Sequence, residues 1–545
     1  MAVEIVMKKG ARISLLVLLA AGLWLALKPT AGNRRLTFLP VHWSEYVDFM
    51  DFWFNLGAFA LLAATAWLAF GTWKKVLGRA CLITGFITLL NVMLELLQSS
   101  IPGRAMDLAD VWAGLLGCVL GIVGSMAVQL MTEGRKSSDG IPQVLFLDQT
   151  GRLGGAELML LDIASARAAD SEVVLFQDGE FRSALENAGV KTRVLRLDDE
   201  ASSVNKQAGL LHVLRSIPGI VQLILQTAQA SRSFDVVYAN TAKALIIGGP
   251  AARLAGRPLI FHLHDIIADG HFSPINQCAL IFCANCFADR VIANSEATKD
   301  AFVARGGRAE LCVVIPNGFH IPEERTNKDD LKKLRFSCLN IPSDAFIVLM
   351  AGRLAHWKGQ HVLLEALKPM PSAHAVLLGD ALFTDEDREY AHRLHAQADE
   401  SELTGRVHFA GFQSDTLAYF DLADVVVHAS VFPEPFGRVI VEGMLAGKPV
   451  IASRAGGAAE IVSHEHTGLL VDPGNVNELA EALMRLQHDS AFAARLALNA
   501  QQTARDVYAL PAVQRQIENL IRKAGKYKTD PIPGTDTAPS ATQAA

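Results

Sequence analysis

From residue 141 onward, the chain alternates short runs of β-branched and aliphatic residues with longer amphipathic stretches. Strands that alternate with helices form parallel sheets whose two faces are both covered by helices. The runs fall into two sets, so the pattern predicts an α/β body with two parallel sheets. The first set comprises 144–147, 173–176, 194–197, 236–239, 259–263, 291–293 and 313–315, and the second comprises 347–350, 375–378, 407–410, 425–428, 450–452 and 469–471.

A charged, proline-containing segment, PEERTNKDDLKKLRF at 322–336, separates the two sets and is expected to be a linker. At 545 residues, the chain exceeds the roughly 250–300 residues at which a single hydrophobic core stops growing. We therefore expect two Rossmann-like domains, at 141–325 and 345–510, and a disordered polar segment at 526–545. Ligands bind beyond the carboxyl ends of such strands, so two domains predict a cleft between them.

Four apolar runs precede residue 135, at 13–27, 52–70, about 80–97 and 111–131. The last contains 21 residues without a charge, enough to cross the ~30 Å hydrocarbon core of a bilayer. Residues 1–135 are therefore predicted to form an α-helical membrane domain with four transmembrane helices. The first run is short and follows Lys8, Lys9 and Arg12, so a cleaved signal peptide is the alternative there.

The distribution of Lys and Arg predicts the orientation of these runs, because cytoplasmic segments carry the excess of positive charge. With the N-terminus inside, eight such residues lie on the inner side and four on the outer side. We therefore expect a multi-pass protein of the inner (plasma) membrane with its α/β body in the cytoplasm. The inner residues are Lys8, Lys9, Arg12, Lys74, Lys75, Arg79, Arg135 and Lys136, and the outer ones are Lys28, Arg34, Arg35 and Arg104.

Charge and cysteine content disfavour several classes of function. The net charge is −6, and no basic tract indicates a nucleic-acid partner. The seven cysteines show no disulfide framework. Cys278, Cys283 and Cys286 have the spacing of some iron–sulfur loops, but their apolar helical context favours thiols in the core. No Gly-x-Ser-x-Gly or His-Glu-x-x-His motif is present, which disfavours the common hydrolases and zinc peptidases.

Gly151, Gly154 and Gly155 form a turn between the first strand and a helix that is expected to begin near Ala156. Such a turn lets backbone N–H groups approach a phosphate at the positive end of the helix. Many strand-to-helix turns are rich in glycine only because they are tight, and the full dinucleotide fingerprint is absent. Both interpretations stay open.

Arg353 and Lys358 follow the first strand of the second set, in AGRLAHWKG. Two cations at the carboxyl end of a strand can neutralise a diphosphate, because Arg binds two oxygens at once and Lys acts as a point charge. Solvated loop charges are the alternative, which is common for one cation and less so for two.

The segment PEPFGRVIVEG contains two glutamates eight positions apart, Glu434 and Glu442. Glu434 is expected on the loop after a strand, and Glu442 on the helix that follows. Carboxylates accept hydrogen bonds from adjacent hydroxyls, so the pair suits a sugar and a ribose. Helix-start amides near Gly437 and Arg438 would then meet the phosphates between them.

Polar residues interrupt the apolar N-terminal region. Ionisable groups in or near lipid usually pair with one another or line a cavity. The alternative is that Asp107 and Asp110 cap the start of a helix and that Arg104 anchors it at the membrane interface. Over about the first quarter of the chain, this pattern resembles that of VanZ-like membrane proteins. The residues are Asp51, Asn55, Glu95, Gln98, Arg104, Asp107 and Asp110.

The body contains GGAE, FHLHD, VIANSEAT, VIPNG, AGRLAHWKG, the Glu-x7-Glu segment and GG-x-x-E ending at Glu460. In this order, over about 141–525, the motifs resemble those of glycosyltransferases of family 4, which are retaining enzymes with the GT-B fold. The resemblance also implies residue roles. It places the donor diphosphate at Arg353 and Lys358, the sugar at Glu434 and His264, the ribose at Glu442, and the phosphate side of the cleft at Gly154 and Gly155.

By the same resemblance, a nucleotide-diphosphate sugar is the co-substrate and no metal is needed. The fused membrane region adds the hypothesis that the acceptor is a lipid-linked saccharide or a polyprenyl carrier at the inner leaflet. Two alternatives stay open. The body could be a non-catalytic sugar-binding module on a lipid- or solute-handling membrane domain, or a GT-A-type enzyme that holds a metal–nucleotide complex at Asp385 and Asp387, although acids also favour a helix start.

Overall fold

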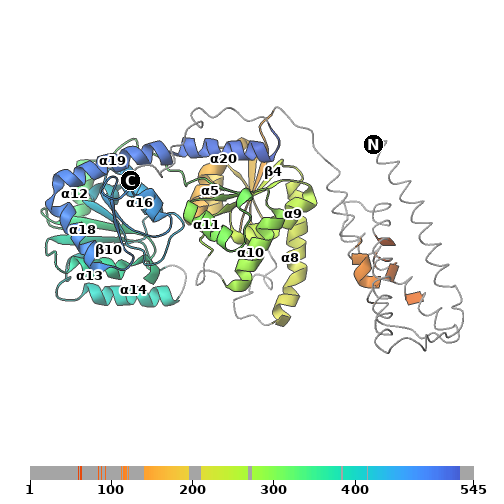
Figure 1. The fold of residues 1–545 in the computed structure, drawn as a ribbon, viewed down its shortest axis with the longest axis horizontal. Helices are drawn as coiled ribbons and strands as arrows, with labels where there is room; N and C mark the ends of the chain where they lie inside the picture. Colours follow the sequence, from red (N-terminus) through yellow and green to blue (C-terminus); the bar gives the residue numbers. More distant parts are fainter. Residues whose placement is uncertain are drawn as a thin grey trace. The chain divides into compact units, whose positions relative to one another are not determined.

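The computed structural model of this chain describes residues 140–195, 210–267, 273–381, 385–413 and 415–527, with scattered positions between 59 and 121; for 210–218 it describes the backbone alone (Figure 1). Apart from those scattered positions, the four predicted membrane runs lie outside the described residues, as do the polar N-terminal residues named above and the predicted disordered segment beyond 527. Within the described part of the chain, no helix combines the length and apolar character that crossing a bilayer requires.

Seven parallel strands form the first sheet: β1 (Val144–Asp148), β2 (Ser171–Leu175), β3 (Lys191–Val194), β4 (Val236–Ala239), β5 (Leu259–Leu263), β6 (Arg290–Ala293) and β7 (Cys312–Val314). Their order is β3-β2-β1-β4-β5-β6-β7. Every residue of β1, β4 and β5 is buried, which explains why these strands consist mainly of apolar residues, with Asp148 and His262 as the ionisable exceptions.

Helices cover both faces of this sheet. One face packs against α5 (Gly155–Ser165), α6 (Glu180–Asn187) and the last helix, α20 (Leu510–Ala524). The other packs against α8 (Leu210–Ser231), α9 (Ala242–Ala255), α10 (Pro274–Phe287) and α11 (Glu296–Ala304). We call this sheet with its helices the first lobe.

Six parallel strands form the second sheet: β8 (Phe346–Ala351), β9 (Ala373–Leu378), β10 (Val407–Gly411), β11 (Val425–His428), β12 (Val450–Ser453) and β13 (Leu469–Val471). Their order is β10-β9-β8-β11-β12-β13. The prediction of two parallel sheets is confirmed. We call this sheet with its helices the second lobe.

Helices also cover both faces of the second sheet. One face packs against α13 (Gln360–Leu367), α14 (Asp385–Ala398) and α18 (Val476–His488). The other packs against α15 (Leu417–Leu422), α16 (Arg438–Leu445) and α17 (Ala458–Ile461), and α19 (Ser490–Tyr508) contributes to both cores. After α19 the chain returns to the first lobe through α20, whose Val513 and Ile517 join the core around β1 (Figure 1).

Two predicted segments differ from the structure. The third strand was expected at 194–197 but spans Lys191–Val194, because this edge strand pairs only with β2 and its outward side chains, such as Lys191, are polar. The linker at 322–336 contains α12 (Lys328–Lys332), which continues into a π-helical segment, Lys333–Cys338. Asn327 begins that helix by accepting hydrogen bonds from the N–H groups of Asp329 and Asp330.

Candidate functional site

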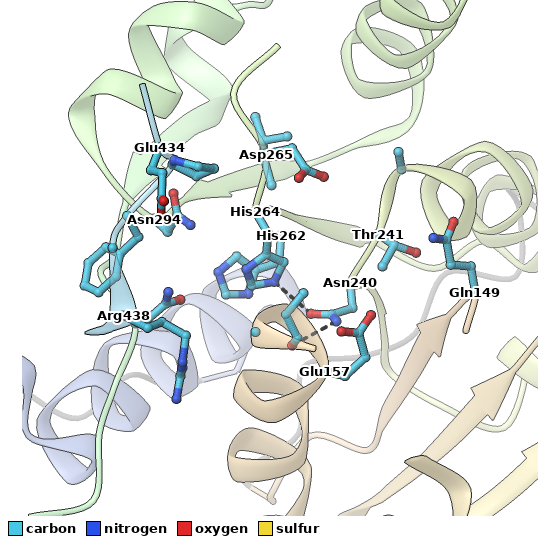
Figure 2. Close-up of a pocket in the computed structure, with 18 of the residues that line it drawn as sticks. Gln149, Glu157, Asn240, Thr241, His262, His264, Asp265, Asn294, Glu434 and Arg438 are labelled. Atoms are coloured by element: carbon cyan, nitrogen blue, oxygen red, sulfur yellow. Dashed lines mark hydrogen bonds between the residues drawn. The ribbon is translucent and has the colours of Figure 1, made fainter. Parts of the chain in front are cut away.

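A cavity of about 780 Å³ is lined by residues from the carboxyl ends of strands in both sheets (Figure 2). Gln149 follows β1, Asn240 follows β4, Asn294 follows β6, and Arg353 follows β8. Of the residues predicted from the sequence, six line this cavity and two, Gly154 and Glu442, do not. The six are Gly155, His264, Arg353, Lys358, Glu434 and Gly437.

Glu434 is buried, and one of its two carboxylate oxygens is heavily engaged. Oε1 lies 2.5 Å from Lys358 Nζ and 3.1 Å from His428 Nε2, and it accepts a hydrogen bond from the Ser430 hydroxyl. Oε2 forms no hydrogen bond with the residues that the structure describes. Burial alone would raise the pKa of Glu434, but Lys358 and His428 more than offset that effect and hold it well below its usual range. The side chain is therefore an anchored, ionised carboxylate with one oxygen available to a ligand.

A single indole ring, that of Trp357, contacts both cations of the AGRLAHWKG segment. Lys358 Nζ lies 4.3 Å from the ring centroid and the Arg353 guanidinium carbon lies 5.6 Å from it. Cation–π contacts of this kind restrict both side chains without neutralising them. The two positive charges are therefore held together at the carboxyl end of β8.

Helix α16 begins at the cavity and places Glu442 beside Arg438. Gly437 is the N-cap of this helix, so its first amides are near the cavity. Arg438 lines the cavity and lies over the Phe319 ring at 4.6 Å, while Glu442 Oε1 lies 3.8 Å from Arg438 Nε. About a third of the Glu442 side chain is exposed.

His264 forms part of the first lobe's wall of the cavity (Figure 2). Its Nε2 lies 3.0 Å from Oδ1 of Asn240, and its ring lies 3.8 Å from that of His262. Burial lowers the pKa of His264 to about 3, with a further contribution from Arg438. His264 is therefore neutral at physiological pH.

Two buried acids lie close to His264: Glu157 lines the cavity, whereas Asp148 does not. Burial raises the pKa of Glu157 to about 7, with a smaller contribution from the charge of Asp148. Burial likewise raises the pKa of Asp148 to about 6, although hydrogen bonds from Thr150 and Asn240 favour its ionised form. The first lobe thus presents Glu157, the neutral His264 and the cation of Lys243 to the cavity, and the second lobe presents Glu434 together with three cations, Arg353, Lys358 and Arg438.

The GG-x-x-E motif supports the Glu434 loop and links the two lobes. Gly457 N donates to Glu434 O at 2.8 Å, and Glu434 pairs with Gly456 as an isolated parallel bridge. The Glu460 carboxylate accepts hydrogen bonds from the backbone N–H groups of Glu296 and Ala297, at 2.8 and 2.6 Å. A side chain of the second lobe therefore caps α11 of the first lobe.

Trp357, His428 and Asn240 are among the residues of the cavity wall that sequence reasoning missed. The sequence position of each of the three could have indicated its place in the site. His428 ends the VVVH strand and Asn240 directly follows the VVYA strand, both at the carboxyl end where ligands bind. Trp357 lies between the two predicted cations in the sequence.

The structure also bears on two expectations about residues outside the cavity wall: the clustered cysteines and the Asp385/Asp387 pair. Of the three clustered cysteines expected in the core, only Cys283 is buried, whereas Cys278 and Cys286 are exposed. Their helix, α10, also carries apolar residues on its exposed face, among them Ile275 and Phe282. Asp385 is exposed at the start of α14, where it pairs with Arg388, and neither Asp385 nor Asp387 lines the cavity. Within the described residues, no group of three or more side chains is arranged to hold a metal ion.

Three segments of the chain match known protein families. Residues 332–503 match the family described as "Glycosyl transferases group 1", and residues 154–318 match the "Glycosyl transferase 4-like domain". Residues 13–129 match "VanZ/LLP1". The two larger matches cover the second and first lobes respectively.

Individual relatives agree with these matches. The crystal structure of Anabaena Alr3699/HepE in complex with UDP-glucose is 40% identical, with a TM-score of 0.63, and the similarity covers 70% of this chain and 100% of that one. The lipopolysaccharide core biosynthesis glycosyltransferase LpsE of Rhizobium meliloti (strain 1021) is 36% identical over 165 residues, which is 30% of this chain and 46% of LpsE. The D-inositol 3-phosphate glycosyltransferase of Nocardioides sp. (strain ATCC BAA-499 / JS614) is 27% identical over 69% of this chain and 87% of that protein. The chain spans about half the length of the first curated relatives it matches.

Proposed function

The chain belongs to the family of group 1 glycosyl transferases, and from this premise we propose that it transfers a sugar from a nucleotide-diphosphate sugar to a saccharide acceptor. One observation carries the proposal. The cavity that contains Arg353 and Lys358 also contains the buried carboxylate of Glu434, whose Oε2 is available to a ligand. Cations suit the diphosphate of such a donor, and a carboxylate suits the hydroxyls of its sugar.

A uridine diphosphate sugar is the donor that we propose. The Anabaena protein was crystallised in complex with UDP-glucose, and this chain matches its full length at 40% identity. Glu434 would accept hydrogen bonds from sugar hydroxyls through Oε2. Glu442, which lies on α16 and does not line the cavity, would bind the ribose at the edge of the site.

Stabilisation of the leaving diphosphate is the main catalytic task that we assign to the second lobe. Arg353 can bind two phosphate oxygens at once, and Lys358 retains two further N–H donors beyond the one directed at Glu434. The first amides of α16, after Gly437, add backbone donors. Losing one such donor typically costs ~3 kcal/mol of transition-state stabilisation.

Retention of configuration is the stereochemical course that we propose. The bond between the anomeric carbon and the leaving phosphate oxygen breaks, and the acceptor oxygen forms its bond on the same face. The acceptor's proton passes to the leaving phosphate oxygen, so no side chain has to act as a strong base. We also propose that transfer proceeds without a metal ion, and unchanged turnover in EDTA is the expected result.

The N-terminal region supports a proposal about the acceptor. Residues 13–129 match VanZ/LLP1, and the four apolar runs in that region predict membrane spans. A membrane-anchored transferase with its body in the cytoplasm would meet both cytoplasmic nucleotide sugars and lipid-linked saccharides. We therefore propose a lipid-linked saccharide of the inner leaflet as the acceptor, in the synthesis of a cell-surface glycan.

The test uses the purified full chain with UDP-glucose, membrane lipid extract and detection of glycosylated products by mass spectrometry. We expect release of UDP and a product one hexose heavier than an extract lipid. A chain that binds UDP-glucose but releases no UDP would contradict the proposal and support the non-catalytic sugar-binding alternative. Transfer to soluble saccharides with none to lipid would contradict only the proposed acceptor.

A further inference from the structure

A series of hydrogen-bonded polar groups extends from His264 into the first lobe and joins three neighbouring strands of the first sheet. Figure 2 shows its first two members, His264 and Asn240. His264 follows β5, Asn240 follows β4, and Asp148 ends β1. His264 Nε2 lies 3.0 Å from Asn240 Oδ1, and Asn240 Nδ2 donates to Asp148 Oδ2 at 2.8 Å. Asn240 and Asp148 have no exposed surface, so the Asp148 end of this hydrogen-bonded series is shielded from solvent.

The partners of Asn240 determine which way its amide points. Its Nδ2 also donates to the backbone carbonyl of Ala156, at 3.2 Å. A carbonyl oxygen can only accept a hydrogen bond, so the amide nitrogen must face Ala156 and Asp148. Oδ1 then faces His264, and a hydrogen bond to Oδ1 requires a proton on His264 Nε2.

A neutral imidazole that carries its proton on Nε2 has an acceptor lone pair on Nδ1. The ring stays neutral because its pKa is about 3, lowered by burial and by Arg438. The His262 ring contacts the same ring in a tilted arrangement, with 3.8 Å between the ring centroids, and is itself held by a 2.7 Å hydrogen bond between Tyr238 OH and Nδ1 of His262. The Nδ1 atom of His264 forms no hydrogen bond with the described residues, and His264 lines the cavity.

We propose that Asn240 and Asp148 are positioning residues that fix His264 as its Nε2–H tautomer, so that Nδ1 accepts a hydrogen bond from a sugar hydroxyl in the cavity. This inference rests on the proposed function, because it takes the ligand to be a sugar. It also sets a selectivity: a ligand that has a hydrogen or an ether in place of that hydroxyl leaves Nδ1 unpaired. An acceptor that the bound ligand shields from water and leaves unpaired is costly, so such a ligand is turned over more slowly.

A spectroscopic test does not depend on turnover. In the full chain labelled with ¹⁵N-histidine, the imidazole signals missing from the His264→Leu variant belong to His264. At pH 7 we expect a protonated Nε2 and an unprotonated Nδ1, and a mixture of tautomers in Asn240→Leu. A His264 ring protonated on Nδ1, or on both nitrogens, would overturn the proposal whatever the enzyme transfers.

A double-mutant cycle tests the consequence for activity, with UDP-glucose as the probe and release of UDP as the readout. We expect Asn240→Leu and His264→Leu each to lower kcat about 10- to 100-fold while the Kd for UDP stays within about twofold. Because Asn240 acts through His264, the double variant should be no slower than the slower single variant. Multiplicative losses would show that Asn240 acts independently of His264.

Two further measurements protect the test against a folding defect. Asn240→Asp keeps an oxygen acceptor toward Nε2 but replaces the donor to Asp148 with a second carboxyl, so it is compared with the isosteric Asn240→Leu below about pH 6, where the two facing acids can share one proton. There Asn240→Asp should retain more activity than Asn240→Leu; equal loss in both variants, with unchanged UDP binding, would contradict the inference. In a panel of monodeoxy analogues of UDP-glucose, one hydroxyl should matter to the wild type and not to His264→Leu. If the wild type releases no UDP, the proposed function fails; if it does and all variants match it, only the inference fails.

Discussion

Lys358 Nζ lies 2.5 Å from Glu434 Oε1, so the cation proposed to hold the donor diphosphate and the carboxylate proposed to hold the sugar form one ion pair. The two side chains are 17% and 7% exposed, so the pair is largely shielded from solvent. Removing one partner leaves the other charge buried and uncompensated, which costs about 3–5 kcal/mol in buried pairs. A substitution at this pair is therefore expected to affect both stability and turnover, and a second substitution at the partner separates the two effects.

Glu434→Gln should abolish UDP release and also lower the melting temperature, because it leaves the Lys358 charge without its partner. Adding Lys358→Met should recover much of the lost stability, since no charge remains unpaired, yet should restore no turnover. Thermal unfolding and UDP release measured on the same samples separate the two effects. Glu386→Gln, an exposed glutamate on α14, is the matched control and should behave as the wild type. Wild-type turnover in Glu434→Gln would contradict the assignment of the site.

Glu460→Ala should loosen the contact between the lobes, because it removes both hydrogen bonds to the start of α11. Loss of a helix cap costs about 0.5–2 kcal/mol, and here it destabilises the contact between the two lobes. We expect faster hydrogen exchange at the amides of Glu296 and Ala297 and a higher KM for UDP-glucose. Glu465→Ala is the control, because Glu465 pairs with Arg485 inside the second lobe. Exchange at α11 that equals the wild-type rate would show that the cap contributes nothing to the contact.

The strand pattern predicted the sheets well because central parallel strands are buried on both faces. Val236–Ala239 and Leu259–Leu263 have the predicted bounds, whereas the edge strand β3 does not, since its polar side chains hide the pattern. Charged motif residues such as Lys358 and Glu434 could be assigned to strand ends from the sequence. The partners of Glu434 in space, His428 and Ser430, could not be assigned, because nothing in the pattern indicates which atoms meet across a loop.

Gly456→Ala should displace the Glu434 loop. Gly456 has φ +59°, and a Cβ there would lie 2.4 Å from Glu434 O and 2.8 Å from Glu434 N. Because these are backbone atoms, the loop itself has to move, so we expect kcat to fall at least tenfold. Gly474→Ala is a matched control: its φ is +77°, which costs similar backbone strain, but the nearest atom to its Cβ is 3.9 Å away. Equal loss of activity in both variants would indicate backbone strain alone, without a specific effect on Glu434.

Glu157 should make the stability of the protein depend on pH near neutrality. Burial raises the pKa of Glu157 from 4.5 to about 7, so between these values the folded state binds more protons than the unfolded state. Stability from this group is therefore fully present below about pH 4.5 and is lost as the pH rises through about 7.

Glu157→Gln removes the ionisable group but keeps a polar side chain of the same size. At pH 8 the free energy of unfolding of the variant should exceed that of the wild type by up to about 3 kcal/mol, and its melting temperature should be correspondingly higher. Both differences should shrink as the pH falls toward 5. Asp148, whose pKa is about 6, remains in both proteins; because its charge acts on Glu157, the difference between the proteins reports Glu157 together with its interaction with Asp148. Glu186→Gln, at an exposed position on α6, should show no such trend. A melting-temperature difference for Glu157→Gln that is constant from pH 5 to pH 8 would mean that Glu157 is ionised throughout, with its charge compensated by a group in the cavity wall.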